Sequence, residues 1–155
     1  MNIYEKLKEL NLELPAAPPK GGVYSPCQEF GKSLVYISGC GPVIGTKRVS
    51  GKLGSEYTIE EGQEAARRCM INIISNLHHE LGDLNRIKQF VKLLGFVASA
   101  PDFYEHPQVI NGASQLLKDV FGDEIGLPAR SAIGVAALPW NIPVEIELIL
   151  ELKES

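Results

Sequence analysis

Apolar residues recur along this 155-residue chain at two periods, and stretches of the two kinds alternate. Apolar residues three or four positions apart predict helices over residues 2–11, 58–81 and 108–120. Alternating or unbroken apolar runs predict strands over residues 23–30, 34–38, 87–99, 127–138 and 144–150. This order of elements fits a mixed sheet that contains a βαβ unit and carries two helices on one face.

The sequence also marks the ends of the two long helices. Thr58 and Glu61 have the spacing of a capping box, in which each side chain accepts a hydrogen bond from the other residue's backbone N–H. Gly82 and Gly122 follow the last apolar positions of the two helices and are expected to end them. Residues 46–55 are polar and contain glycine, so we expect an exposed loop there.

The strand over residues 87–99 differs from the others because its apolar residues are nearly continuous. Such a strand is expected to be buried on both faces, in the middle of the sheet. We expect residues 1–155 to form a single domain, in which residues 1–20 supply the short N-terminal helix and a proline-rich linker.

Composition excludes several classes of protein. The formal net charge of −4 and the pI of about 5.4 disfavour binding to nucleic acid. Cys27, Cys40 and Cys69 match neither a disulfide framework nor a zinc site. His78-His79-Glu80 lacks the second histidine of the H-E-x-x-H zinc motif, so we interpret it as the polar end of a helix and expect no metal. The N-terminus has no signal-peptide core, and a cytoplasmic protein is expected.

The last two predicted strands carry the candidate chemistry. If they form a hairpin with its turn between Trp140 and Asn141, four pairs lie opposite one another: Ala136 and Glu145, Gly134 and Glu147, Ala132 and Ile149, Arg130 and Glu151. Arg130 and Glu145 then share one face, and the face containing Ser131, Ile133 and Val135 packs on the helices. The ladder separates Arg130 from Glu145 by about 20 Å. A small substrate could use both only in a pocket shared between subunits of a closed cyclic oligomer.

Several segments resemble the RidA (YjgF/YER057c/UK114) family of enamine/imine deaminases. Over nearly the whole chain after residue 20, the matching segments are Val23-Tyr24-Ser25, Ile37-Ser38-Gly39, Val109-Ile110-Asn111, Pro128-Ala129-Arg130-Ser131, Leu138-Pro139 and Val144-Glu145-Ile146-Glu147. The resemblance implies an α+β, chorismate-mutase-like fold and a homotrimer with clefts between subunits. It also implies hydrolysis of 2-aminoacrylate-type enamines and their imines, such as 2-iminobutanoate and 2-iminopropanoate, to 2-keto acids and ammonia, without cofactor or metal.

The resemblance also implies a role for each matching residue. Arg130 would bind the substrate carboxylate through its guanidinium fork, assisted by the Gly39 backbone N–H. Glu145 would orient or deprotonate the attacking water. Tyr24, Ser38 and Asn111 would line the cleft. Without the resemblance, Arg130 fits an exposed arginine and Glu145 a solvated strand face; Ser38 and Gly39 fit a turn, and Tyr24 fits a packed aromatic.

The chain departs from the common family pattern at the rim of the expected pocket. Ala132 stands where the family often has cysteine, and Cys40 stands where common members have glutamine. The length, the N-terminal helix and the insertion at residues 122–126 indicate a longer subgroup. Two alternatives therefore stay open: a trimeric module that binds 2-keto acids or other carboxylates without turnover, and an endoribonuclease. The latter predicts a basic, aromatic groove that the sequence does not contain.

Overall fold

The structure of the protein, a computed structural model, describes residues 2–47 and 49–154. Residue 48, inside the predicted loop 46–55, and residues 1 and 155 of the predicted domain lie outside this range. The elements run in chain order through α1 (Ile3–Glu9), β1 (Cys27–Phe30), β2 (Leu34–Cys40), α2 (Ile59–Leu81), the 3-10 turn η1 (Leu84–Arg86), β3 (Ile87–Ala98), α3 (His106–Gly126), β4 (Ala129–Val135), the 3-10 turn η2 (Pro139–Asn141) and β5 (Val144–Leu152).

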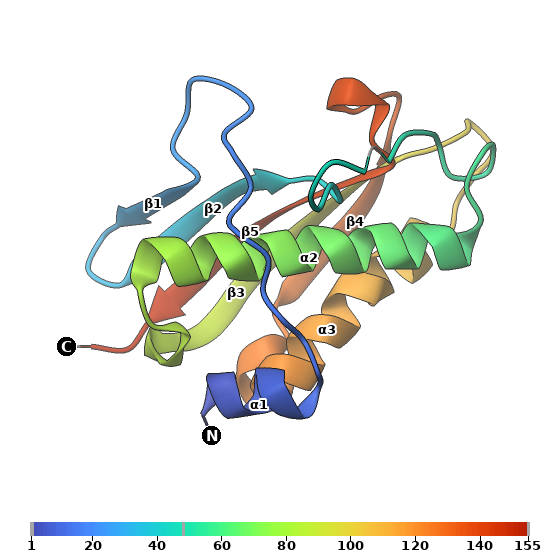
Figure 1. The fold of residues 1–155 in the computed structure, drawn as a ribbon. Coiled ribbons are helices and arrows are strands. Elements are labelled where there is room, and N and C mark those ends of the chain that lie inside the picture. The colour runs from blue at the N-terminus through green and yellow to red at the C-terminus, as the bar shows by residue number, and fades with distance from the viewer. Residues whose placement is uncertain (1, 48, 155) are drawn as a thin grey trace.

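A mixed sheet forms one layer of the molecule and the long helices form the other (Figure 1). In the described residues the strand order is β1-β2-β5-β3-β4. α2 packs against β2 and β5, and α3 packs against β3 and β4. The apolar core lies between the layers, because alternate residues of β5 and the inner faces of both helices are buried. The predicted α+β architecture, with a mixed sheet and both main helices on one face, is confirmed.

The sequence predicted α2 almost to the residue. The Thr58 hydroxyl accepts a hydrogen bond from the Glu61 N–H at 3.2 Å, and the Glu61 carboxylate accepts one from the Thr58 N–H at 2.8 Å. The helix ends at Gly82, whose φ of 76° is the left-handed conformation expected of a terminating glycine. The buried side of α2 also carries Asn72, whose amide donates to the carbonyls of Gly41 and Val43 and so fastens the loop after β2.

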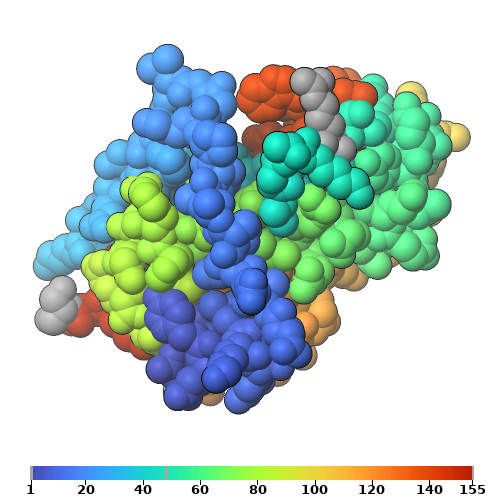
Figure 2. Space-filling model, viewed as in Figure 1, coloured from blue at the N-terminus to red at the C-terminus, as the bar shows by residue number. Residues whose placement is uncertain are grey.

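The N-terminal segment packs along the helical layer. α1 contacts η1 and α3, and the chain then crosses α2 on its way to β1, as the blue segment in Figure 2 shows. β1 and β2 form the predicted antiparallel hairpin, but β1 begins at Cys27 instead of residue 23, and β2 continues to Cys40. α3 is also longer than predicted. Gly122 breaks the helical geometry, with φ 78° and ψ 174°, and a final turn then continues to Gly126.

The predicted pairing of the last two strands is wrong. β4 pairs in parallel with β3, and β5 pairs antiparallel with both β2 and β3, so β3 separates the two strands that we expected to form a hairpin. The chain from β3 through α3 to β4 is the βαβ unit, which places β4 at the edge of the sheet. The short connection through η2 then crosses the end of β3 to reach β5. Apolar alternation specifies which residues point inward, but not which strand is the neighbour.

The predicted faces of β4 are also reversed. Arg130 bonds to α3, and a Cβ placed on Gly134 would collide with the ring of His106 on α3, so this row of β4 faces the helices. Ile133 lies on the opposite side and is 44% exposed. β3 likewise is not buried on both faces, because Val91 is 38% exposed on the side away from the helices. We call this side of the sheet, which no helix covers, the open face.

Candidate functional site

The guanidinium of Arg130 is held by two side chains of α3. Arg130 Nη1 donates to Asn111 Oδ1 at 2.8 Å and to Ser114 Oγ at 3.1 Å. The structure therefore brings together two predicted site residues, Arg130 and Asn111. Within residues 2–47 and 49–154, Nε and Nη2 of Arg130 have no hydrogen-bond partner. Two donors of the fork are thus available to a carboxylate, which binds such a fork in a bidentate manner.

Ser114 was not predicted from the sequence, although a signal for it exists. It lies three residues after Asn111, one helical turn further along the same face of α3. Once Asn111 is placed next to Arg130, the hydroxyl at this spacing is the next group along the helix that can reach the guanidinium. We define Arg130, Asn111 and Ser114 as the arginine half-site.

Glu145 lies on the other side of the sheet. The buried residues of β5 are Val144, Ile146 and the alternate positions after them, so Glu145 and Glu147 project from the open face. The Glu145 carboxylate lies beside Gly39 on β2. A Cβ added to Gly39 would come within 2.9 Å of Glu145 Cδ and even closer to Oε1, so the absence of a side chain at position 39 makes room for the carboxylate. The pairing of β2 with β5 shifts register between Ile37 and Cys40, which places this glycine at an irregularity in the strand.

The electrostatic setting of Glu145 favours proton uptake. Burial raises the pKa of Glu145 above its ordinary value, and the negative charge of Glu147 raises it further. Among the described residues no side chain or backbone donor bonds to the Glu145 carboxylate. A carboxylate that is half-buried and unpaired is a stronger base than an exposed one, and it is free to bond to water.

Two more predicted residues lie in β2 and in the segment before β1: Ser38 adjoins Gly39, and Tyr24 precedes β1 in sequence. Ser38 Oγ donates to the Ser25 carbonyl at 2.6 Å, and the Ser38 N–H donates to the Pro26 carbonyl at 2.9 Å. Tyr24, 45% exposed, accepts a hydrogen bond from the Gly21 N–H at 3.2 Å. These bonds fix the segment before β1 against β2. We define Glu145, Gly39, Ser38 and Tyr24 as the glutamate half-site.

The two half-sites do not meet within one chain. Arg130 projects toward α3 from the edge strand β4, whereas Glu145 projects from the open face of β5, and β3 lies between these strands. The prediction that Arg130 and Glu145 share a face is therefore wrong. The expectation that Gly39 assists Arg130 also fails within one chain, because Gly39 lies beside Glu145. A single small molecule cannot contact both half-sites of the same protomer.

Cys40 is a buried thiol next to the glutamate half-site. Its sulfur accepts a hydrogen bond from the Asn76 amide at 3.3 Å, and burial raises the pKa of Cys40 to about 11. The thiol is therefore protonated at neutral pH and serves as a packing residue. Within the described ranges there is also no group of three or more His, Cys, Asp or Glu residues with the geometry to hold a metal ion.

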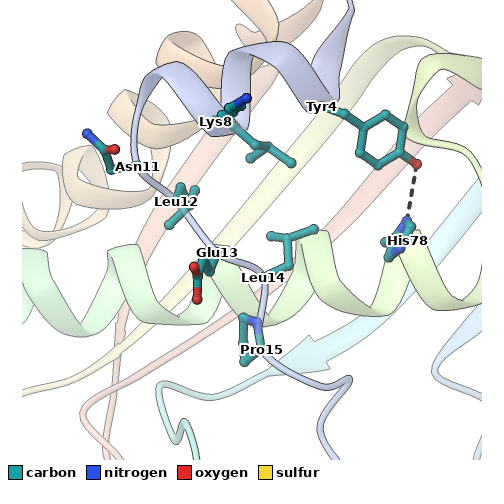
Figure 3. A pocket seen from close by; sticks show the side chains of 9 residues that line it. Tyr4, Lys8, Asn11, Leu12, Glu13, Leu14, Pro15 and His78 are labelled. Carbon is teal, nitrogen blue, oxygen red and sulfur yellow. Dashed lines mark hydrogen bonds between the residues drawn. The ribbon is translucent and has the colours of Figure 1, made fainter.

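A surface hollow lies away from both half-sites. It runs between α1, the segment after it and the C-terminal end of α2, and it is lined by residues such as Tyr4, Leu12, Leu14 and His78 (Figure 3). Tyr4 and His78 are joined by a hydrogen bond of 3.1 Å between the phenol oxygen and Nδ1. His78 thus helps to dock the N-terminal helix.

No helix in the described part of the chain is long and apolar enough to cross a membrane.

Comparisons with a family model, with known sequences and with solved structures all point to the same family. Residues 5–152 match the family described as "YjgF/chorismate mutase-like, putative endoribonuclease". Protein TCP17 of Trypanosoma cruzi is 43% identical over 150 residues, which is 95% of this chain and 92% of that protein. A solved structure from Shewanella oneidensis MR-1, with the same endoribonuclease description, has a TM-score of 0.92 and 33% identity over 98% of this chain and 100% of that one.

A more distant relative has a named activity. The 2-iminobutanoate/2-iminopropanoate deaminase of Dermatophagoides farinae is 27% identical over 142 residues, which is 92% of this chain and 95% of that protein.

Proposed function

This chain belongs to the YjgF/RidA family, and on that premise we propose that it hydrolyses 2-aminoacrylate-type enamines and their imines to 2-keto acids and ammonia. One observation carries the proposal. The chain combines an arginine fork with unpaired donors, suited to a carboxylate, and an unpaired glutamate whose pKa is raised. A 2-imino acid needs one group for its carboxylate and one base for the attacking water. The name of the mite relative supports the same reaction.

The reaction follows from these two groups. Arg130 binds the substrate carboxylate, and Glu145 takes a proton from a water molecule as the water oxygen forms a bond to the imine carbon. The electron pair of the C=N bond moves to nitrogen, which gives a carbinolamine. Glu145 then transfers its proton to nitrogen, and the C–N bond breaks as the hydroxyl oxygen forms the C=O bond and returns its proton to Glu145. The ammonia released takes up this proton and leaves as ammonium. For the smallest substrate, one 2-iminopropanoate zwitterion and one water give one pyruvate and one ammonium ion.

We further propose that each cleft forms between two subunits of a cyclic homotrimer. Because the two half-sites lie on opposite faces of one chain, a complete site needs the arginine half-site of one subunit and the glutamate half-site of its neighbour. The open face carries exposed apolar groups, among them Val91 and Ile133, that such an assembly would cover. Sedimentation of the purified protein as a monomer would contradict this assembly.

The decisive assay adds the purified protein to a pyridoxal-phosphate enzyme that generates 2-aminoacrylate and follows the decay of the imine. We expect faster decay with the wild-type protein and, at 2-aminoacrylate concentrations far below KM, about a hundredfold weaker acceleration with Arg130→Ala. Equal acceleration by the two proteins would rule out this function. A binding module without turnover would bind 2-keto acids yet leave the decay unchanged. An endoribonuclease is disfavoured by the net charge of −4.

A mixing experiment tests the shared cleft separately. At substrate concentrations far below KM, Arg130→Ala and Glu145→Gln are each expected to be nearly inactive. Subunits of the two variants that are unfolded and refolded together can form clefts with both intact groups. With random assembly about one quarter of the clefts regain an arginine from one subunit and a glutamate from the next. Recovery of about one quarter of the wild-type rate is therefore expected. No recovery in demonstrably mixed oligomers would place both groups within one subunit.

A further inference from the structure

A second carboxylate stands beside Glu145 and is fixed by a tyrosine. Glu145 and Glu147 are two positions apart on β5, so both project from the open face with their Cβ atoms roughly 7 Å apart. Tyr36, on the neighbouring strand β2, donates its hydroxyl hydrogen to Glu147 Oε1 at 2.6 Å. This length is typical of a charge-assisted hydrogen bond, in which the acceptor is ionised.

The hydrogen bond also affects the tyrosine that donates it. Bonding to this carboxylate is the main cause that raises the pKa of Tyr36, because loss of the phenol proton would place two negative charges in contact. Tyr36 therefore stays protonated at neutral pH and keeps donating to Glu147. A bond this short also restricts the rotamers of Glu147, so its charge has a defined position relative to Glu145.

No cation in the described ranges neutralises this pair. Two lysines of β3 are bonded to other groups: Lys88 pairs with Glu151 at 3.0 Å, and Lys92, which lines the same small hollow as Tyr36 and Glu147, donates to Ser131 Oγ at 2.8 Å. The titratable groups that β2 and α2 place near Glu145 are the thiols of Cys40 and Cys69, which burial keeps protonated. Within one subunit, the charge that acts on Glu145 is therefore mainly that of Glu147. In the proposed assembly a neighbouring arginine half-site also faces Glu145, but it is the same in the wild-type protein and in Glu147→Gln.

We propose that Glu147, locked in place by Tyr36, is a positioning residue whose fixed negative charge makes the neighbouring Glu145 carboxylate the stronger proton acceptor. The inference rests on the proposed function in one respect, namely that Glu145 is the base. Glu147 does not touch the substrate in this scheme. It acts through Glu145, and Tyr36 acts through Glu147.

The primary test is a titration that needs no substrate. In protein labelled with ¹³C-glutamate, the Glu145 carboxyl signal is identified by its absence from Glu145→Gln and followed with pH. We expect Glu147→Gln to lower the Glu145 midpoint by roughly half a unit to one unit, because a like charge has been removed. Glu151→Gln is the matched control: it removes one carboxylate from the same face of β5, farther away, and leaves the midpoint in place. No shift in Glu147→Gln, or an equal shift in both variants, overturns the proposal.

Tyr36→Phe tests the clamp. It keeps the ring and the Glu147 charge but removes the hydrogen bond, so Glu147 can turn toward water, and the Glu145 midpoint is expected to fall by less than in Glu147→Gln. A wild-type midpoint in Tyr36→Phe overturns the assigned role of Tyr36.

Kinetics separate this inference from the proposed function. In wild-type protein the acid limb of kcat/KM for imine hydrolysis is expected to follow the Glu145 midpoint, and in Glu147→Gln both are expected to move to lower pH together. A purely structural role of Glu147 would lower the rate without moving the limb. Wild-type protein that fails to hydrolyse imines rejects the deaminase proposal and leaves the charge coupling measurable by titration. If the wild-type protein is active but Glu147→Gln moves neither the acid limb nor the Glu145 midpoint, the coupling between Glu147 and Glu145 is rejected and the deaminase proposal stands.

Discussion

The arginine half-site and the glutamate half-site differ in how their charged groups are held. Arg130 is a charge that stays ionised at any physiological pH, and its position is fixed by neutral partners on α3. Glu145 has no such partner, and its surroundings make its charged form less favourable. One region is preorganised to bind an anion, and the other holds a group that can take up and release a proton. In the proposed reaction, this difference supports carboxylate binding by the first region and proton transfer by the second.

Removing the base is expected to have the largest effect on activity. Glu145→Gln keeps the size of the side chain but cannot accept a proton from water, so kcat is expected to fall by about a thousandfold. Affinity for a 2-keto acid, measured by calorimetry, is expected to stay near the wild-type value. A comparable loss of affinity would show that Glu145 belongs to binding and would erase the contrast between the two half-sites.

Removing the arginine is expected to cost about a hundredfold in kcat/KM, mainly through KM, since one charge-assisted hydrogen-bonded contact is lost. Arg130→Lys is expected to recover only part of this loss, because an ammonium group cannot form two parallel bonds to a carboxylate. Lys32→Ala, in the turn between β1 and β2, controls for the loss of one positive charge. Full activity in Arg130→Lys would mean that charge alone is sufficient at this position.

Removing the hydrogen bonds from α3 to Arg130 is expected to reduce activity less than removing Arg130 itself. Asn111→Ala and Ser114→Ala each remove one hydrogen bond to Nη1, and each is expected to raise KM about threefold to tenfold. Gln115→Ala, on the same helix and bonded to Asp119, is the matched control. Steady-state kinetics that show a fall in kcat with an unchanged KM would contradict the role of these residues as supports.

The smallest expected effect is on stability. The pKa of Glu145 is higher in the folded protein than in the unfolded chain. The ionised carboxylate therefore lowers the free energy of unfolding, and this cost grows as the pH rises from the pKa of the unfolded chain to that of the folded protein. Glu145→Gln is therefore expected to stabilise the protein at pH 7 by no more than a few tenths of a kcal/mol, since water screens the half-exposed carboxylate. The gain should vanish in thermal melts below the unfolded pKa. A destabilised variant at pH 7 would mean that Glu145 makes a favourable contact in the assembly.

Local signals were sufficient to predict most elements. The capping box at Thr58 and the glycine at 82 placed α2, and helical spacing placed α3 apart from its last turn. These features depend on residues close together in sequence. The pairing of β4 depends instead on how α3 returns the chain to the sheet, which alternation along β4 does not encode. The hairpin prediction failed for this reason. Because β4 was paired with the wrong strand, its helix-facing and open-face residues were also interchanged.

The candidate site also combines residues that the sequence indicates with residues that only the folded structure brings together. Asn111 was predicted to lie near Arg130 through family resemblance, and the two are in contact. Ser114, Tyr36 and Glu147 act through contacts between elements. The spacing of Ser114 from Asn111 indicates its role only after Asn111 has been placed next to Arg130, and no spacing distinguishes Tyr36 or Glu147. The geometric argument for a pocket shared between subunits came from a pairing that does not exist, whereas the family resemblance implied such clefts independently. The opposite faces of Arg130 and Glu145 now support it on a different basis.

Trp140, in the short turn that leads into β5, also gives the protein its own optical probe. It is the only tryptophan of the chain and is 77% exposed, and its ring lies against Gly21, where an added Cβ would come within 2.6 Å of the indole. Gly21 in turn bonds to Tyr24 of the glutamate half-site. Any movement of that segment changes the surroundings of one fluorophore. If a 2-keto acid binds at the glutamate half-site and moves this segment, the intrinsic emission of Trp140 is expected to change on titration of the unlabelled protein.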